Sequence, residues 1–159
     1  MSENKQMTKE PLLSICIPTY NRGNWLRVSL SCWLGQIKDF QGKVELVVSD
    51  NASDDNTQEV VKEAQKIIPF SYYRNTENIG LNRNVIRVVE AARGRFVWVA
   101  TDDALPRSSA LGRVLNALSE NAQIEHIFIN ATNKEFRQPP SGQEEIDAFA
   151  LTPAMNVLI

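Results

Sequence analysis

Short apolar runs alternate along the chain with longer stretches in which apolar residues recur at helical spacing. The short runs predict strands, and the longer stretches predict amphipathic helices. Strands are expected at 12–18, 44–49, 70–74, 95–100 and 124–130, the third of them more polar and near an edge. Helices are expected at 25–37, from a cap at 53–55 to residue 68, at 81–92 and at 108–120. This alternation predicts an α/β fold, with a mainly parallel sheet and helices on both faces.

The same spacing predicts which residues face the core. The apolar faces of the second and third helices comprise Val60, Val61, Ala64, Ile67 and Ile68, and Leu81, Val85, Val88, Val89 and Ala92. We also expect Trp25, Trp33 and Trp98 in the core, and Gly94 at the end of the third helix. The polar residues at 53–55 are placed to cap the second helix.

Polar residues directly follow three of the expected strands. PTYNR occupies 18–22, DNASDD occupies 50–55 and TDD occupies 101–103. In open parallel sheets, ligands bind outside the carboxyl ends of the strands. The three segments therefore predict one polar rim, and Asp50 lies on that rim at the tip of a buried strand.

Two common phosphate-binding motifs do not match this rim. A dinucleotide-binding domain needs a G-x-G-x-x-G turn after its first strand, where the backbone approaches a pyrophosphate. Here the turn reads PTYNRG, with proline and tyrosine where glycines are required, and the glycine-rich loop and lysine of a P-loop are missing too. A carboxylate at the tip of the second strand still suits a nucleoside, because it accepts hydrogen bonds from base N–H groups or ribose hydroxyls.

Four segments together resemble the signatures of family 2 glycosyltransferases. They are ICIPTYNR, VVSDNASDD, NIGLNRN and the TDD that follows a hydrophobic strand. Each is a weak motif alone, but all four occur in order at strand ends or helix starts, over residues 12–130. The resemblance implies the GT-A fold and is strongest to bacterial enzymes that build surface polysaccharides such as O-antigen.

The resemblance also implies a role for each segment. Tyr20 would flank the nucleotide base, and Asp50 would accept the imide N–H of that base. Arg83 would lie near the base or the diphosphate. Asp102 and Asp103 would hold the ribose and a divalent cation, Mn²⁺ or Mg²⁺, that bridges the diphosphate. The residues implied in nucleotide-sugar binding are Pro18, Thr19, Tyr20, Arg22, Asp50, Asn51, Arg83 and Asp102, with Asp103 and Asp102 on the metal.

Asp50 further predicts the base of the donor. Uracil, thymine and guanine present an N–H at the edge that a carboxylate would read, whereas cytosine and adenine present an acceptor nitrogen there. Charge-assisted hydrogen bonds contribute about 1.5–3 kcal/mol, so the affinity for the first three bases would exceed that for cytosine or adenine by roughly tens-fold.

The acidic motif departs from a literal D-x-D. Related enzymes often carry three consecutive aspartates followed by a proline, and alignment on Pro106 places Ala104 at the third position. One cation ligand would then be missing and metal affinity would be reduced, with Asp103 remaining as the expected ligand.

Each of these residues also has a structural interpretation. Asp50 could belong to a turn and helix cap, and Asp102 with Asp103 could form a solvated turn. Arg83 could be a surface arginine, and Tyr20 could be a packing aromatic. His126, the single histidine, is flanked by apolar residues and is expected to be structural.

Composition narrows the class of protein. The net charge of −2 argues against a nucleic-acid partner, which usually requires a basic face. Cys16 and Cys32 lack metal-ligand spacing and are expected to be thiols in a reducing compartment. No apolar stretch is long enough to span a bilayer, and the polar first ten residues do not resemble a signal peptide. We therefore expect a cytoplasmic protein.

The expected organisation is a disordered lead-in at 1–10, a nucleotide-sugar-binding domain at 11–137 and an acceptor-side segment at 138–159. The last segment is expected to be incomplete, because its apolar end has no polar tail. An inverting transferase needs a carboxylate general base that deprotonates the acceptor hydroxyl. Glu144, Glu145 and Asp147 lie in the corresponding region, but no signature marks them, and the base is expected to be absent.

The resulting hypothesis is transfer of a sugar from a nucleoside diphosphate donor to a hydroxyl acceptor, with inversion implied by the family. The acceptor would be a saccharide or lipid-linked saccharide, with transient membrane contact. Two alternatives remain at this point. A nucleotidyltransferase would need a glycine-rich loop with arginine and lysine after the first strand, whereas PTYNRG has one glycine and one arginine. A non-catalytic nucleotide-sugar-binding module would fit the altered acidic motif.

Overall fold

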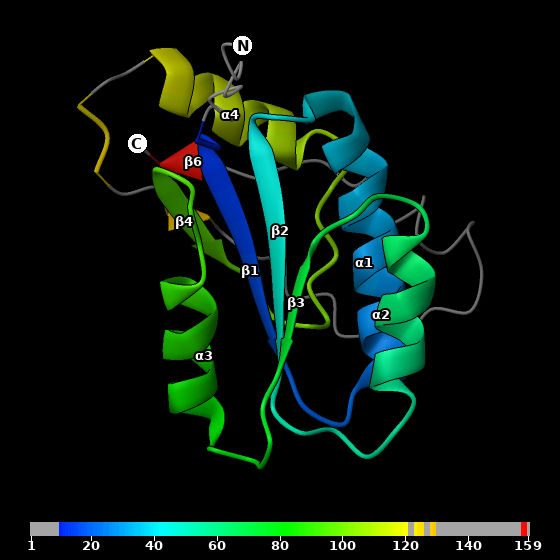
Figure 1. Ribbon diagram of the computed structural model, residues 1–159. Helices are drawn as coiled ribbons and strands as arrows, with labels where there is room; N and C mark the ends of the chain where they lie inside the picture. The colour runs from blue at the N-terminus through cyan, green and yellow to red at the C-terminus, as the bar shows by residue number, and fades with distance from the viewer. Residues whose placement is uncertain (1–9, 121–122, 126–127, 130–156, 159) are drawn as a thin grey trace, which may run out of the picture.

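Four parallel strands form the centre of the molecule, in the spatial order β3-β2-β1-β4 (Figure 1). Their bounds are β1 Leu13–Thr19, β2 Val44–Asp50, β3 Ser71–Arg74 and β4 Phe96–Val99. The computed structural model describes residues 10–120, 123–125, 128–129 and 157–158 of the 159. The predicted α/β fold with a mainly parallel sheet is confirmed. The inner strands β1 and β2 are buried almost throughout, as strands covered on both faces must be.

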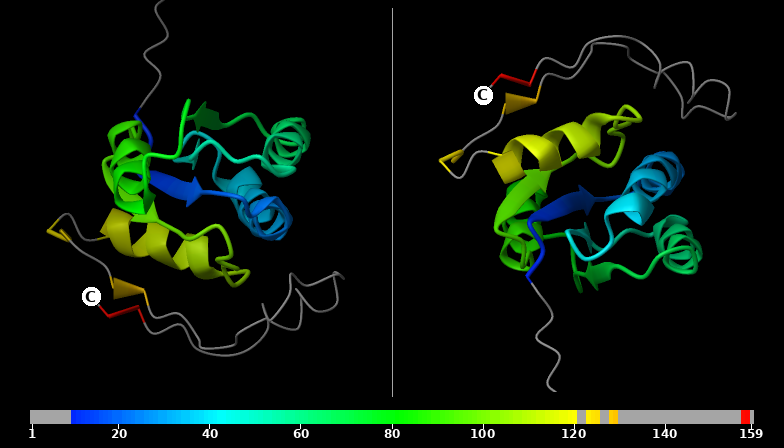
Figure 2. Two further views of the ribbon diagram at one scale, coloured as in Figure 1. Left: turned by 90° about the horizontal axis from the view of Figure 1, so that it is seen from below. Right: turned by 90° about the horizontal axis from the view of Figure 1, so that it is seen from above.

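Helices cover both faces of the sheet. They are α1 Gly23–Ile37, α2 Thr57–Gln65, α3 Leu81–Glu90 and α4 Ala110–Glu120, with a short 3₁₀ turn, η1, at Lys38–Phe40. Figure 2 shows α1 and α2 together on one side of the sheet, with α3 on the other. The core side chains of α4 join those of α1 and α2. Because all four strands are parallel, their carboxyl ends meet at one edge, the lower end in Figure 1.

Alternate residues of β1 supply two separate apolar cores. Ile15 and Ile17 face the larger core under α1, α2 and α4. Cys16 faces the smaller core with Val47 and Val88 of α3, and its thiol donates to the Val88 carbonyl. This period of two is what a strand buried on both faces produces.

The tryptophans divide between core and surface. Trp33 is 1% exposed and meets Trp98 edge-on with ring centroids 5.0 Å apart, as predicted for core aromatics. Trp25 is only half-buried and lies outside the core, so the prediction for this residue is wrong. Its ring lies beneath the guanidinium of Arg22 instead.

Three further sequence predictions are corrected by the structure. Ile67 and Leu81, both expected to face the core, are each 70% exposed, because α2 ends at Gln65 and Leu81 begins the first turn of α3. The strand expected at 124–130 is described only as β5, Phe128–Ile129, which pairs antiparallel with β6, Val157–Leu158, in a separate two-stranded sheet. Pairing over so long a sequence separation is not encoded in local periodicity.

At the amino edge of the sheet, a set of hydrogen bonds to the Glu45 side chain aligns β4 with β1. The Glu45 carboxylate accepts hydrogen bonds from Ser14 Oγ at 2.6 Å and from Arg93 Nε at 2.9 Å. A Cβ on Gly94 would lie 2.5 Å from Ser14 Oγ, so only glycine allows this approach. Gly94 was expected to end a helix, but α3 ends earlier and the residue is needed for strand packing.

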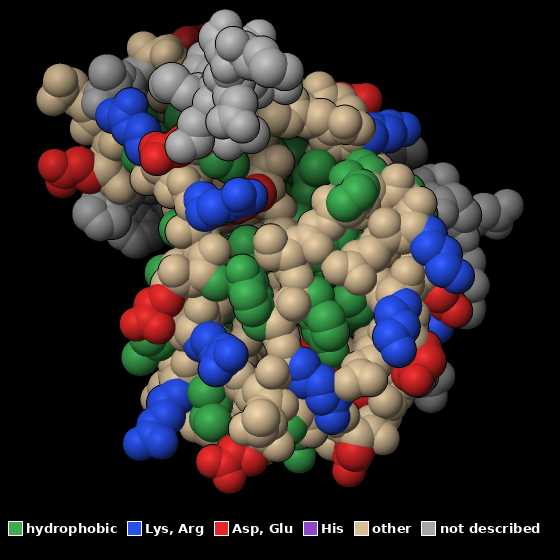
Figure 3. All heavy atoms as spheres, viewed as in Figure 1, with side chains coloured by type: hydrophobic (Ala, Val, Ile, Leu, Met, Phe, Trp, Pro, Cys, Tyr) green, Lys and Arg blue, Asp and Glu red, His purple; other side chains and the backbone are tan. Residues whose placement is uncertain are grey.

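Charged side chains of both signs are interspersed on the face shown in Figure 3. Within the described residues, no helix is both long and apolar enough to cross a membrane.

Candidate functional site at the carboxyl edge of the sheet

Thr19 joins the two acidic centres of the predicted rim. It is the last residue of β1 and pairs in register with Asp50, the last residue of β2. On its other side, Thr19 Oγ1 donates to Asp102 Oδ2 at 2.9 Å. Asp50 and Asp102 therefore flank one buried threonine, and segments separated by more than 80 residues meet at one edge.

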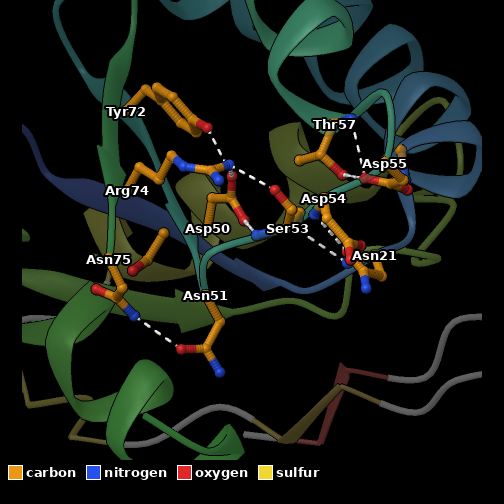
Figure 4. Close-up of polar contacts among 12 residues, drawn as sticks. Asn21, Asp50, Asn51, Ser53, Asp54, Asp55, Thr57, Tyr72, Arg74 and Asn75 are labelled. Atoms are coloured by element: carbon orange, nitrogen blue, oxygen red, sulfur yellow. Dashed lines mark hydrogen bonds and ion pairs between the residues drawn. The ribbon is translucent and has the colours of Figure 1, made fainter. Parts of the chain in front are cut away.

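The Asp50 carboxylate is fully buried and held by three donors (Figure 4). Oδ1 accepts the backbone N–H of Ser53 at 2.8 Å. Oδ2 accepts the Tyr72 hydroxyl at 2.7 Å and Arg74 Nη1 at 3.0 Å. Tyr72 and Arg74 project from β3 toward the tip of β2, because Arg74 pairs in register with Asp50. The charge of Asp50 is thus neutralised by a neighbouring strand.

This arrangement leaves limited capacity for a further ligand on Asp50. A carboxylate has about four acceptor sites, of which three are used here. The unused site is on Oδ1, but Asp50 is 0% exposed. A donor from outside reaches this carboxylate only when the covering side chains shift. Arg74, whose side chain is 34% exposed, is the more accessible part of the network.

The second acidic centre is more open and is held by Arg22. Arg22 Nη2 donates to Asp103 Oδ2 at 2.6 Å, and Arg22 Nε lies 3.1 Å from Asp102 Oδ1. The same guanidinium lies 5.6 Å from the centre of the Trp25 ring. The Arg22 and Asp103 side chains are 41% and 40% exposed, whereas that of Asp102 is 9% exposed. Burial raises the pKa of Asp102 above its ordinary value, although Arg22 and Thr19 act in the opposite direction.

The donor set of this centre suits a cation that is shared with a ligand. Asp102 and Asp103 are hard oxygen donors, and Mg²⁺ is commonly bound through one or two carboxylates plus substrate phosphates. Among the described residues, no three or more His, Cys, Asp or Glu side chains are grouped to hold a metal ion. Ala104, which packs partly against the core, has a methyl side chain and so supplies no third carboxylate. The two carboxylates fit a cation only as part of a larger coordination shell.

Hydrogen bonds join the loop after β1 to the loop after β2. Ser53 Oγ accepts the N–H of Asn21, and Asn21 Oδ1 accepts the N–H of Asp54. Asn21 and Ala52 both have positive φ, at 52° and 65°, which is uncommon for non-glycine residues. Hydrogen bonds therefore hold the two loops together at the carboxyl edge of the sheet.

Asp55 links the starts of two helices. Its Oδ2 accepts the N–H of Gly23 in α1, and its Oδ1 accepts the N–H of Thr57 in α2. Burial acts to raise the pKa of Asp55, but hydrogen bonds from Thr57 and Gly23 outweigh it and hold the pKa below its ordinary value. The N-cap residue of α2 is Asn56, just after the predicted cap at 53–55; Asp55 still bonds to the first N–H of the helix, whereas Ser53 bonds to the β1 loop.

An asparagine cluster fixes the approach to α3. Asn51 Oδ1 accepts both Asn75 Nδ2 and the N–H of Ile79, and Asn51 Nδ2 donates to Asn78. Asn84 is buried, bonds to Ser49 and accepts a second bond from Asn75. The conspicuous asparagines of DNASDD and NIGLNRN therefore order the loop that leads into α3.

The remaining predicted site residues lie at the same edge with fewer contacts. Pro18 is buried within β1, and Tyr20 follows the strand with 43% exposure. Arg83 is exposed in the first turn of α3. The side chains of Tyr20 and Arg83 form no hydrogen bond or ion pair with another described residue. The structure brings Thr19, Asp50, Arg22, Asp102 and Asp103 together but leaves Tyr20 and Arg83 facing solvent.

Tyr72 and Arg74 are the site residues that sequence reasoning missed. The sequence predicts FSYYR as a strand near an edge, and its pattern assigns no role to the polar residues. The signal was present, because Tyr72 and Arg74 are two residues apart and so share one face of a strand. Register with β2, which periodicity does not give, was needed to aim that face at Asp50.

Solved structures define the class of this fold. The described sheet and its flanking helices match the GT-A glycosyltransferase fold. A mannosyltransferase from Pyrobaculum calidifontis, solved with GDP-Man and Mn²⁺, matches with TM-score 0.61 and 26% identity, over 69% of this chain and 33% of that one. S. aureus TarS 1–349 in complex with UDP matches in fold with TM-score 0.67 and 21% identity, over 78% of this chain and 37% of that one.

The chain belongs to glycosyl transferase family 2, whose model matches residues 14–155. Abequosyltransferase RfbV of Salmonella typhimurium is 40% identical over 101 residues, which cover 62% of this chain and 30% of that protein. The GalNAc(5)-diNAcBac-PP-undecaprenol beta-1,3-glucosyltransferase of Campylobacter jejuni is 33% identical over 122 residues, covering 76% and 38% respectively. The chain thus spans about a third of the length of these relatives.

Proposed function

We propose that this chain is the donor-binding part of a glycosyltransferase that moves a sugar from a nucleoside diphosphate to a hydroxyl acceptor. The observation that supports this most is the meeting of Asp50 and the Asp102–Asp103 pair on either side of Thr19. Family membership and the match to a mannosyltransferase solved with GDP-Man and Mn²⁺ support the same reaction class. Similarity to RfbV supports a role in bacterial surface polysaccharide synthesis.

In this proposal the nucleotide lies along the sheet edge from β3 to β4. The exposed Tyr20 flanks the base, while Pro18, Thr19 and Arg22 form the floor of the pocket. The polar edge of the base meets the Asp50 network, and Asn51 holds the loop beside it. Arg83, exposed in the first turn of α3, approaches the base or the diphosphate.

The proposed reading of the base combines Asp50 with its two partners. Movement of Arg74 would open the unused acceptor site of Asp50 to an imide N–H, and Arg74 and Tyr72 would supply donors to base carbonyls. Uracil, thymine and guanine present both kinds of group side by side, whereas cytosine lacks the N–H. A cytidine diphosphate that binds as tightly as uridine diphosphate would contradict this part of the proposal.

At the other end, Asp102 would contact the ribose, and Asp103 with Asp102 would hold Mn²⁺ or Mg²⁺. A bound cation would neutralise charge that develops on the leaving diphosphate. Thr19 fixes the rotamer of Asp102 through its hydroxyl, and Arg22 supplies positive charge beside both carboxylates.

The acceptor side of the reaction lies beyond these residues. Displacement with inversion requires a general base, and Glu144, Glu145 and Asp147 lie outside the described residues. We propose a saccharide or lipid-linked acceptor and a cytoplasmic location with peripheral membrane contact. Similarity to a transferase whose name specifies an undecaprenol-linked substrate supports this acceptor class. Co-sedimentation with vesicles carrying a polyprenyl diphosphate saccharide, compared with vesicles lacking it, tests the acceptor and location.

A thermal-shift panel tests donor binding directly. UDP, GDP, dTDP, CDP and ADP are each added with and without Mn²⁺. At 100 times its Kd, a ligand that binds only the folded state adds about 2.7 kcal/mol of stability. We expect stabilisation by UDP, dTDP or GDP that increases with Mn²⁺. The absence of stabilisation by every diphosphate would overturn the proposed function.

The non-catalytic alternative is favoured by one observation, the presence of two rather than three acidic residues at the cation centre. An assay for slow hydrolysis of a nucleoside diphosphate-sugar in the presence of Mn²⁺ distinguishes a catalytic donor site from a non-catalytic binding module. Metal-dependent release of the diphosphate supports a catalytic donor site, and binding without release supports a binding module.

A further inference from the structure

Arg22 contacts both carboxylates of the proposed cation centre. Its Nε lies 3.1 Å from Asp102 Oδ1, and its Nη2 lies 2.6 Å from Asp103 Oδ2. The other oxygen of Asp102, Oδ2, accepts the Thr19 hydroxyl. One guanidinium thus engages one oxygen from each of the two aspartates that would hold the cation.

We infer that Arg22 is a resident counter-charge, which a divalent cation must displace before it can bind Asp102 and Asp103. This inference rests on the proposed function, since it concerns the same centre. A guanidinium keeps its charge throughout the accessible pH range. Mg²⁺ and Mn²⁺ bind oxygen ligands at about 2.0–2.2 Å, so a guanidinium that stayed on the same two carboxylates would lie within about 4 Å of a doubly charged ion and be repelled by it. The two cations therefore compete for one pair of carboxylates.

The surroundings of Arg22 allow such a displacement. Its side chain is 41% exposed, and its guanidinium already lies over the Trp25 ring. Asp103, with 40% exposure, faces the same open side. By contrast, Arg74 is tied to a carboxylate that is 0% exposed and to the Ser53 carbonyl. Of the two arginines that neutralise rim aspartates, Arg22 is the one with an exposed partner, Asp103, and a cation that replaced Arg22 would supply the positive charge that the buried Asp102 requires.

Displacement gives Arg22 a second partner. A released guanidinium beside the cation centre can donate two parallel hydrogen bonds to a phosphate group. Cation binding would then be weak without nucleotide, where Arg22 stays on the aspartates, and stronger with a diphosphate that accepts Arg22. Arg22 would thereby couple the binding of the cation to the binding of the diphosphate.

The test measures Mn²⁺ binding alone, from the loss of the free-ion electron paramagnetic resonance signal. Arg22→Gln removes the charge and Arg22→Lys keeps it. Arg27→Gln removes an equivalent charge from α1, the helix that follows Arg22, where Arg27 pairs with Glu63. We expect Arg22→Gln to bind Mn²⁺ at least about tenfold more tightly than wild type, because a like charge within about 4 Å is removed. Arg22→Lys and Arg27→Gln are expected to stay within about threefold of wild type.

A second titration adds UDP. In the wild type, UDP should tighten Mn²⁺ binding more than it does in Arg22→Gln. Arg22→Ala repeats the neutral substitution, and circular dichroism checks that each variant is folded. Equal Mn²⁺ affinity in wild type and both neutral variants would overturn the inference, even if UDP with Mn²⁺ stabilises the wild type as the proposed function requires. Tighter Mn²⁺ binding by the neutral variants would support the inference, even if no nucleotide stabilised the chain and the proposed function failed.

Discussion

The two acidic centres on either side of Thr19 differ in how their charge is accommodated. Asp50 is 0% exposed, and its three hydrogen-bond donors come from β3 and from the loop after β2. Asp103 is 40% exposed, and it pairs with the half-exposed Arg22. The first centre is built into the fold, whereas at the second the buried Asp102 is joined by an exposed aspartate, Asp103, that pairs with a long exposed side chain.

This difference separates stability from ligand binding. A buried carboxylate must keep its partners, because its removal leaves buried donors without acceptors. An exposed ion pair contributes little to stability, because water screens it and two flexible side chains must be ordered. Substitutions at Asp50 should therefore act mainly on folding, and substitutions at Asp103 should act mainly on ligands.

The largest effect is expected from Asp50→Ala. The substitution leaves Tyr72 Oη and Ser53 N without their acceptor and takes the carboxylate from Arg74, which keeps the Ser53 carbonyl. Removing one partner of a buried pair costs about 3–5 kcal/mol. We expect the free energy of unfolding to fall by about 3 kcal/mol, at the low end of this range, because Arg74 is one-third exposed and remains partly solvated. Urea unfolding measures the loss. Asp54→Ala, at an exposed aspartate in the same loop, is the matched control, and equal losses in both variants would contradict the buried-centre description.

Tyr72→Phe should have a smaller effect on the same centre. Asp50 keeps two donors, and the variant loses one hydrogen bond to a charged group, which is worth about 1–2 kcal/mol. Burial and the bond to Asp50 both raise the pKa of Tyr72, consistent with a hydroxyl that donates to a carboxylate. Tyr73→Phe, on the exposed neighbour, should change the free energy of unfolding by less than about 0.5 kcal/mol. A Tyr72 variant as stable as this control would argue against the bond.

Asp102→Asn should have an effect whose size depends on pH. Because burial raises the pKa of Asp102 in the folded state, the protonated form favours folding below the ordinary pKa of 3.8. That stability is lost as the pH rises through the folded-state pKa. Asparagine does not titrate, so the stability of the variant relative to wild type should increase from about pH 3.5 to about pH 7. Urea unfolding at a series of pH values measures the difference, and a difference that decreases over this window would contradict the assigned direction.

The smallest effect on stability is expected from Asp103→Asn. The Arg22–Asp103 pair is exposed on both sides, so the variant should unfold within about 0.5 kcal/mol of wild type. It should nevertheless lose the additional stabilisation that Mn²⁺ gives to a bound nucleoside diphosphate. Thermal shifts with UDP, with and without Mn²⁺, measure this loss. Asp39→Asn, an acidic residue in η1, should retain the full Mn²⁺ effect.

The strand and helix order was predictable because each element carries its own periodicity. The convergence of PTYNR, DNASDD and TDD also followed from sequence, since parallel strands end at the same edge. What could not be predicted depended on register and on side-chain direction. The pairing of Arg74 with Asp50 requires the register of β2 against β3, and the exposure of Leu81 requires the position of the first turn of α3.

The contacts of Arg22 were beyond sequence reasoning for a related reason. PTYNR places an arginine at the rim, but neither its spacing nor its charge shows that it contacts both aspartates of TDD. These residues are 80 positions apart and meet only because β4 lies beside β1. Similarly, the aspartates at 54 and 55 look equivalent in sequence, and only the packing of α1 on α2 distinguishes Asp55 as the residue that accepts an N–H from the first turn of each helix.

Gly23 determines how the loops after β1 and β2 are spaced at the carboxyl edge of the sheet. A Cβ at this position would lie 2.2 Å from Asn56 Oδ1 and 2.9 Å from the backbone nitrogen of Thr57. The first turns of α1 and α2 are therefore in backbone contact, and a methyl group between them would push the two turns apart. The contact between α1 and α2 at Gly23 therefore sets the separation of the loops that follow β1 and β2, although Gly23 has no side-chain functional group.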